Sequence, residues 1–162
     1  MKEKNAKPPG RHDAKENKKN PCASAPLRPC VKFLSVKTEN EISREIVRCA
    51  IEAHRTLGGP GLLESVYEEA LTWELQQAGL DVQRQVSLPI PYKGQTLATP
   101  LRIDLIVDGK VIVECKATSQ YNQVFEAQTL TYLRLTGLKL GLVINFGERM
   151  VKNGIHRVVN GL

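Results

Sequence analysis

Two acidic residues and a lysine lie close together in an apolar part of the chain. Asp104 lies in one apolar run, and Glu114 and Lys116 lie in the next, after a turn at residues 108–109. Ionised side chains in apolar surroundings cost free energy unless they pair with one another or bind a metal ion. Carboxylates bind hard divalent cations, and a nearby lysine stabilises negative charge on a reacting phosphate. The chemistry that these residue types favour is metal-dependent cleavage of a phosphodiester bond.

Hard-metal chemistry suggests a role for each residue. Asp104 and Glu114 would supply anionic oxygens to Mg²⁺ or Mn²⁺, since Mg²⁺ takes one or two carboxylates and keeps several waters. The backbone carbonyl of Cys115 would add another oxygen. Lys116 would orient or deprotonate the attacking water, or stabilise charge on the pentacoordinate phosphate. Burial and two neighbouring carboxylates shift the pKa of this lysine in opposite directions, so the sign of the shift stays open.

The Glu-x-Lys triplet is weak evidence when it is taken alone. At average composition each of the two residue types occupies roughly 6% of positions, so the triplet occurs by chance about once in every two chains of this length. The alternative interpretation is a cross-strand ion pair on a solvated sheet face. The apolar surroundings count against this alternative without excluding it.

The loop between the two strands must satisfy a geometric condition. Successive strand residues face opposite sides, so Glu114 and Lys116 share one face. A two-residue turn at Asp108–Gly109 would pair Asp104 with Val113, and Asp104 and Glu114 would then lie on opposite faces. The site therefore requires an odd-length loop or a bulge, such as a type I turn whose glycine is left-handed. A clean two-residue turn would exclude the site.

Helices are predicted on both sides of these strands. Thr38 and Glu41 have the spacing of a capping box, and apolar residues at helical spacing follow to about Leu57. The segment 58–61, Gly-Gly-Pro-Gly, breaks this helix, and a second helix follows and ends near Gly79. The three helices are predicted at residues 38–57, 62–78 and 121–136.

The strand pattern completes the predicted fold. Pro89 and Pro91 favour an edge position for the first strand. The predicted order of elements is α-α-β-β-β-α-β-β, which is typical of an α/β fold with a mixed central sheet flanked by helices. The strands are predicted at residues 82–90, 101–107, 110–117, 138–146 and 155–159.

The charge of the chain is unevenly distributed. Residues 1–37 contain ten Lys/Arg against three Asp/Glu, whereas residues 38–162 contain 13 against 14. This composition predicts a disordered basic tail at 1–37 and a nearly neutral folded domain at 38–162. The tail would add non-specific affinity for phosphates, or it is a solvated extension without function.

Composition also limits the cofactor and the compartment. No run of 18 apolar residues is present, so no membrane span is expected. The four cysteines form no C-x-x-C pair, so zinc ligation is not expected and a reducing cytoplasm is the default location. The oligomeric state, including a homodimer, is left open.

Further polar residues on the predicted helices allow two interpretations each. Glu64 lies in the first turn of the second helix, where a carboxylate commonly does no more than complement the helix dipole. Gln128 and Tyr132 are four residues apart on the third helix and share a face, which an ordinary amphipathic boundary would also explain. His54 lies on an apolar stripe and is interpreted as a core histidine with its hydrogen bonds satisfied.

The segment from Gly61 to Tyr67 resembles the signature of the GxxExxY protein family, a branch of the PD-(D/E)XK nuclease superfamily. Relatives often carry histidine before the Glu-Ala-Gln run where this chain has Phe125, so a role for such a histidine is in doubt here. The resemblance covers about residues 40–150 and continues through Ile103–Leu105, Glu114–Ala117, Glu126–Gln128, Tyr132–Leu133 and Leu140–Phe146.

This resemblance implies a restriction-endonuclease-like αβββαβ core and a role for each matching residue. Asp104 and Glu114 would be metal ligands and Lys116 the catalytic lysine. Glu64 would be the helix carboxylate that completes the metal environment. Gln128 and Tyr132 would match a Q-x-x-x-Y helix motif that positions the site and contacts DNA.

The sequence thus predicts a cytoplasmic, Mg²⁺- or Mn²⁺-dependent nuclease-like protein that acts on nucleic acid, most simply DNA. One alternative is a catalytically inactive member that binds nucleic acid or protein, which the nearly neutral domain favours. The two acids retained beside Lys116 argue against it. A second alternative is a regulatory protein whose basic tail docks a partner.

Overall fold

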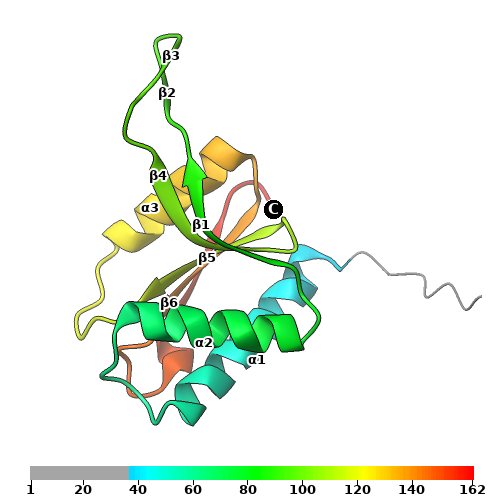
Figure 1. Ribbon diagram of the computed structural model, residues 1–162, viewed down its shortest axis with the longest axis vertical. Coiled ribbons are helices and arrows are strands. Elements are labelled where there is room, and N and C mark those ends of the chain that lie inside the picture. The colour runs from blue at the N-terminus through cyan, green and yellow to red at the C-terminus, as the bar shows by residue number, and fades with distance from the viewer. Residues whose placement is uncertain (1–36) are drawn as a thin grey trace, which may run out of the picture. The chain divides into compact units, whose positions relative to one another are not determined.

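The computed structural model describes residues 37–162, and the predicted tail lies outside this range except for Lys37. The described chain forms a five-stranded sheet and a separate two-stranded hairpin, with helices on both sides of the sheet (Figure 1). The helices are α1 (Glu39–Thr56), α2 (Glu64–Gln77) and α3 (Val124–Thr136). The sheet strands are β1 (Val82–Leu88), β4 (Leu101–Val107), β5 (Val111–Lys116), β6 (Leu140–Asn145) and β7 (Ile155–Val159).

The helix boundaries follow from local chemistry. The Thr38 hydroxyl accepts a hydrogen bond from the Glu41 amide at 3.3 Å, and the Glu41 carboxylate accepts one from the Thr38 amide at 2.8 Å. This capping box starts α1, as predicted. Gly79 and Gly137, each with φ near +74°, follow the ends of α2 and α3. None of the helices in residues 37–162 is long and apolar enough to cross a membrane.

The sheet has the order β1-β4-β5-β6-β7, in which β5 and β6 run parallel and the other neighbours run antiparallel. The mixed α/β fold is therefore confirmed. The edge position of β1, predicted from its prolines, is confirmed as well. The sequence did not predict the exposed hairpin of β2 (Pro91–Tyr92) and β3 (Gln95–Thr96), or the short 3₁₀ helix η1 (Val151–Gly154).

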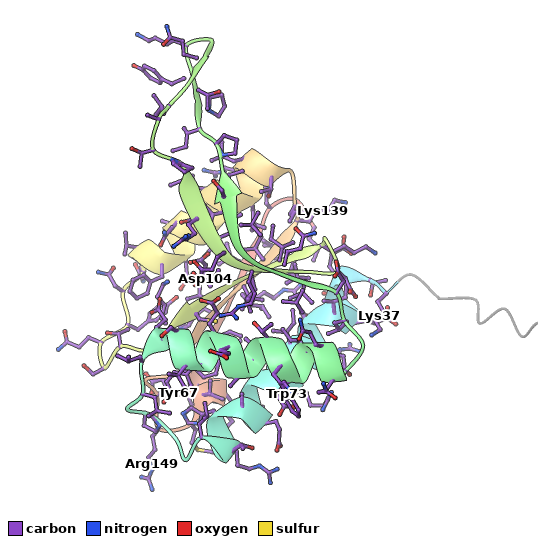
Figure 2. The ribbon with its side chains drawn as sticks, viewed as in Figure 1. Lys37, Tyr67, Trp73, Asp104, Lys139 and Arg149 are labelled. Carbon is purple, nitrogen blue, oxygen red and sulfur yellow. The ribbon has the colours of Figure 1, made fainter. Side chains whose placement is uncertain are left out.

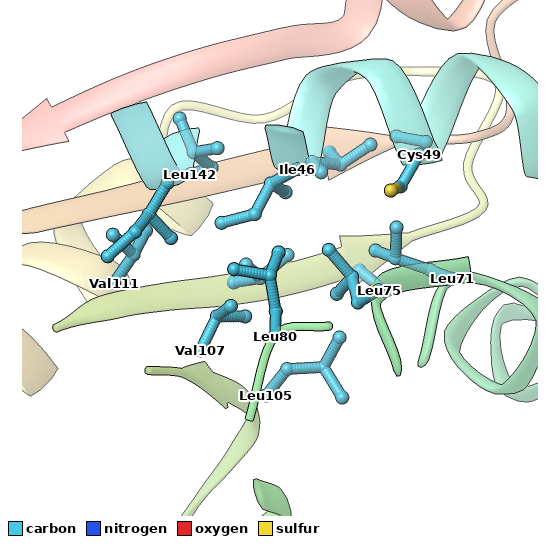
Figure 3. Close-up of a cluster of buried hydrophobic side chains, with 14 of the residues drawn as sticks. Ile46, Cys49, Leu71, Leu75, Leu80, Leu105, Val107, Val111 and Leu142 are labelled. Atoms are coloured by element: carbon cyan, nitrogen blue, oxygen red, sulfur yellow. The ribbon is translucent and has the colours of Figure 1, made fainter. Parts of the chain in front are cut away.

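Two apolar cores lie on the two faces of the sheet. The larger core joins the sheet to α1 and α2, and Figure 3 shows part of it. The smaller core joins the opposite face to α3 through Ile103, Ile112, Tyr132, Leu133 and Val143. Burial on both faces fixes the register of the central strands, since a shift by one residue would exchange their apolar faces. The labelled side chains of the larger core in Figure 3 are Ile46, Cys49, Leu71, Leu75, Leu80, Leu105, Val107, Val111 and Leu142.

The loop between β4 and β5 satisfies the condition that the site requires. Val107 pairs with Val111, which leaves a three-residue loop, and continuing this register places Asp104 opposite Glu114. The predicted odd-length loop is therefore confirmed. Its expected type I geometry is wrong, because Asp108 and Gly109 both have positive φ, +50° and +63°. Two left-handed central residues are typical of a type I′ turn, whose twist matches that of the adjoining strands.

The alternation of faces along β4 breaks at Asp104. Leu105 packs in the larger core, yet Ile103, two residues earlier, packs in the smaller core on the opposite face. On the neighbouring strand Gln85 lies opposite Asp104 and has φ of +51°. A non-glycine residue in this region is strained, and such strain persists where the surrounding structure requires it. The two strands therefore change face at Gln85 and Asp104, which lie opposite each other.

Candidate active site

The ammonium group of Lys116 lies among three carboxylates from three different elements. Its Nζ is 3.4 Å from Glu114 Oε2 on β5, 3.8 Å from Asp104 Oδ2 on β4 and 3.7 Å from Glu64 Oε1 on α2. The Glu114 side chain is 2% exposed and that of Lys116 is 15% exposed, so little solvent reaches the pair. Figure 2 labels Asp104 in the region between α2 and α3. The structure thus brings together the three residues of the hairpin and Glu64.

The two strand carboxylates bind the strands to each other where the regular ladder ends. Paired ladder residues stop at Leu105 and Val113. Beyond them, the Cys115 amide donates to Asp104 Oδ2 at 2.9 Å, and the Asp104 amide donates to Glu114 Oε1 at 3.4 Å. Carboxylates that accept backbone N–H groups are held in fixed positions, which a preorganised site requires.

The electrostatics of the cluster follow from its burial. Burial, together with the nearby Asp104 carboxylate, raises the pKa of Glu114 from 4.5 to about 7, although Lys116 opposes the shift. Burial likewise raises the pKa of Glu64, and Lys116 again opposes it. Burial lowers the pKa of Lys116, but the carboxylates of Glu114, Asp104 and Glu64 together outweigh it and the pKa is raised. The sequence left open the direction of the Lys116 pKa shift, and the structure gives it as upward.

Helix α3 contributes the other two predicted residues. Gln128 Nε2 donates a hydrogen bond to the Tyr132 hydroxyl, so the two side chains act as a unit. Tyr132 is buried, and its pKa is raised by this burial and by the Glu114 carboxylate. The Lys116 Nζ also lies 5.7 Å from the centre of the Phe125 ring. Helix α3 therefore borders the cluster.

Comparison with known proteins agrees with this geometry. A family model described as the PD-(D/E)XK nuclease superfamily matches residues 40–158. The chain belongs to this superfamily. Its mixed sheet flanked by helices is consistent with the restriction-endonuclease-like fold. No curated protein and no solved structure gives a significant match. The match identifies the superfamily, and membership of the GxxExxY branch stays a prediction.

Two further polar residues that the sequence analysis missed lie beside the carboxylate cluster. Glu68, one helical turn beyond Glu64, is 5% exposed. Its carboxylate accepts from Gln85 Nε2 at 2.6 Å and from Arg84 Nε at 3.1 Å. The same Gln85 amide nitrogen lies 3.5 Å from Asp104 Oδ1. The i, i+4 spacing of the two helix glutamates was a signal for Glu68, whereas nothing in the sequence marked Gln85.

The donor set of this PD-(D/E)XK site fits a hard cation that keeps much of its water. Within residues 37–162 no three His, Cys, Asp or Glu side chains gather closely enough to hold a metal ion by themselves. Mg²⁺ needs only one or two carboxylates, which Asp104 and Glu114 would supply. The Cys115 amide points toward Asp104, and the carbonyl of the same residue lies on that strand edge. These oxygens suit Mg²⁺ or Mn²⁺ better than they suit zinc.

Proposed function

We propose that the protein is a metal-dependent nuclease that hydrolyses phosphodiester bonds in DNA. The observation that carries this proposal is the position of the Lys116 ammonium, 3.4–3.8 Å from the carboxylates of Glu114, Glu64 and Asp104. Placing three acids and a lysine in a mostly buried site costs desolvation free energy. A module that only binds nucleic acid has no need for this arrangement.

The residues of the cluster would divide the reaction among themselves. Asp104, Glu114 and the Cys115 carbonyl would hold Mg²⁺ or Mn²⁺, which supplies a Lewis acid for the phosphate and lowers the pKa of bound water. Lys116 would donate to the phosphate oxygens as negative charge develops on them. Glu64, from the first turn of α2, would complete the charge around the site.

Helix α3 would hold the strand that is cleaved. Gln128 is exposed and bonded to Tyr132, so its amide is fixed in place yet open to a substrate. We propose that these two side chains contact the DNA backbone, as the GxxExxY resemblance implies. The buried thiols of Cys49 and Cys115 are free, in keeping with a cytoplasmic location.

The second candidate function is that of a catalytically inactive member that binds nucleic acid or protein. The charge of residues 38–162, with 13 Lys/Arg against 14 Asp/Glu, counts against a nuclease that acts on duplex DNA, because duplex-binding domains usually present a basic patch. Within the second candidate this charge favours protein as the partner. A catalytic site that must bind a divalent cation is acidic by necessity, so the balance of charge alone does not decide between the two.

A cleavage assay separates the two candidates. The purified chain is incubated with supercoiled, linear and single-stranded DNA and with RNA, in Mg²⁺, in Mn²⁺ and in EDTA. We expect cleavage of DNA with either metal and none in EDTA. Asp104→Asn should abolish cleavage, while Glu69→Gln, a change to an exposed glutamate on α2, should leave it unchanged. Binding without cleavage under every condition would replace the nuclease with a binding module.

A further inference from the structure

A pocket of about 410 Å³ lies where the end of α1 meets η1. Its apolar lining comes from Ile51 on one side and from Met150 and Val151 on the other. The backbone of Gly58 and Gly59 closes one edge, and none of the lining residues belongs to the candidate active site. Its volume lies in the range of small-molecule sites, roughly 300–1,000 Å³.

A buried histidine without a hydrogen-bond partner lines this pocket. His54 is 6% exposed, and its Nε2 has no partner within residues 37–162. The expectation of a satisfied core histidine is therefore wrong. Its ring lies 6.3 Å from the rings of Tyr67 and Phe146, which stack on each other at 4.7 Å and hold it in place. Buried polar atoms are nearly always bonded, so an ordered water or a ligand would supply the bond that this nitrogen lacks.

The outer edge of the pocket is cationic. Arg55, Arg149 and Lys152 line it, and Arg149 extends outward in Figure 2. Arg55 is paired with Glu52 at 2.7 Å. In the described part of the chain no carboxylate lies within ion-pair distance of Arg149 or Lys152. Two cations are thus available to an anion that enters over the apolar walls.

We infer that this pocket binds a nucleoside monophosphate, either as a free nucleotide or as the phosphorylated end of a strand. The base packs against Ile51, Met150 and Val151 and bonds to His54, and the phosphate pairs with Arg149 and Lys152. Apolar walls, one buried polar atom and a cationic rim together match a flat heteroaromatic body that carries an anion. The choice of a nucleotide among such anions rests on the proposed nuclease function.

Phe146 connects the pocket to the candidate active site. The Phe146 ring neighbours His54, and the Phe146 amide donates to the Lys116 carbonyl at 2.7 Å. Binding itself requires neither metal nor cleavage, so it is measured in their absence.

The test titrates the full chain in EDTA with the four deoxynucleoside 5′-monophosphates, the matching nucleosides and inorganic phosphate. Dissociation constants and the NMR signals of the His54 imidazole are recorded. We expect at least one monophosphate to shift the His54 signals and to bind about tenfold or more tightly than its nucleoside or phosphate alone. Failure of every monophosphate to bind below about 10 mM overturns the inference.

Variants locate the binding and separate it from catalysis. Arg149→Gln combined with Lys152→Gln changes only exposed side chains and should weaken binding about tenfold. His54→Phe keeps the ring stack, removes the nitrogen and should also weaken it. Lys139→Gln and Lys116→Ala should bind as the wild type does. Wild-type binding by both pocket variants overturns the inference, whatever the cleavage assay shows.

Single-stranded oligonucleotides with a 5′-phosphate or a 5′-hydroxyl distinguish the two sources of the ligand. If the phosphorylated strand binds more tightly than the free nucleotide, and this difference is lost in His54→Phe, the pocket is assigned to a strand end. Tighter binding of the free nucleotide assigns it to a small molecule. Either result supports the same ligand chemistry.

Discussion

The carboxylate cluster around Lys116 and the pocket lined by His54 differ in whether their polar groups have partners. In the cluster each charge faces a partner, with Lys116 Nζ within 4 Å of Glu64, Asp104 and Glu114. In the pocket the Nε2 of His54 faces none within the described residues. A cation that binds the cluster must therefore displace the proton of Glu114 or the ammonium group of Lys116. A ligand of the pocket displaces no charged group and gains a hydrogen bond to His54. The two regions should respond differently to substitution and to pH.

The largest effect should follow from neutralising Glu114 in the carboxylate cluster. Glu114→Gln removes a proposed metal ligand, so we expect the rate of cleavage to fall about 10²-fold or more. The metal-free protein should lose little stability, because a neutral amide avoids the desolvation of a charge in a site only 2% exposed. The rate of DNA cleavage and urea unfolding in EDTA measure the two effects. Retained cleavage would remove Glu114 from the metal site.

The second-largest effect should be the pH dependence of metal binding. Burial holds the pKa of Glu114 near 7, against 4.5 ordinarily, so as the proposed Mg²⁺ ligand this carboxyl would have to lose a proton before it binds the metal. Affinity should fall about tenfold for each pH unit below 7 and level off above it. In the metal-free protein the raised pKa contributes stability that is complete below pH 4.5 and lost as pH rises through 7. Calorimetric titration from pH 5.5 to 8.5 checks the slope, and a flat profile would contradict it.

A smaller effect is expected from Gln85, which joins Glu68 to the carboxylate cluster. Gln85→Gly removes the amide that joins Glu68 to Asp104 and relieves the strain of φ +51°. We expect the free energy of unfolding to change by less than about 1 kcal/mol, because the relieved strain and the lost hydrogen bond to buried Glu68 oppose each other. We expect kcat to fall about tenfold with KM little changed. Thermal unfolding and steady-state kinetics measure both.

Gln83→Gly on the same strand is the matched control for this variant. It places glycine at a position where positive φ is not required, so it should weaken the strand slightly without lowering kcat. A loss of stability at Gln85 with unchanged kcat would mean that this residue has a structural role only.

The smallest effect should come from the pocket. His54→Phe replaces an unpartnered nitrogen while keeping an aromatic ring beside Tyr67 and Phe146. A buried polar atom without a hydrogen bond destabilises the folded state. We therefore expect the free energy of unfolding to rise by about 1 kcal/mol, with cleavage of long DNA unchanged. A destabilised variant would show that His54 is satisfied in solution and would remove the contrast between the two regions.

The sequence predicted the parts of this site that depend on local rules. The capping box at Thr38 follows from short-range geometry, and the structure confirms it. The odd-length loop after Val107 was required by the site hypothesis together with strand alternation, and the structure confirms it as well. Alternation along β5 placed Glu114 and Lys116 on one face in the same way. Residues that share a face or a turn can be found without knowledge of the fold.

What the sequence could not predict depends on contacts between distant segments. Gln85 is left-handed only because it lies opposite Asp104 and beside α2, and no strand pattern encodes that. His54 looked like a core residue because its helical stripe is apolar. Its place in a pocket depends on the position of η1, about a hundred residues later. Glu64 was separable from an ordinary helix cap only through the family signature.

The most direct test of metal-dependent hydrolysis at the cluster compares two lysine variants. Single-turnover cleavage of DNA in Mg²⁺ is measured for the wild type, for Lys116→Ala and for Lys139→Ala, an exposed lysine labelled in Figure 2. We predict that Lys116→Ala lowers the rate about 10²- to 10³-fold and that Lys139→Ala leaves it within about twofold. Equal rates for the two variants would contradict a catalytic role for the cluster.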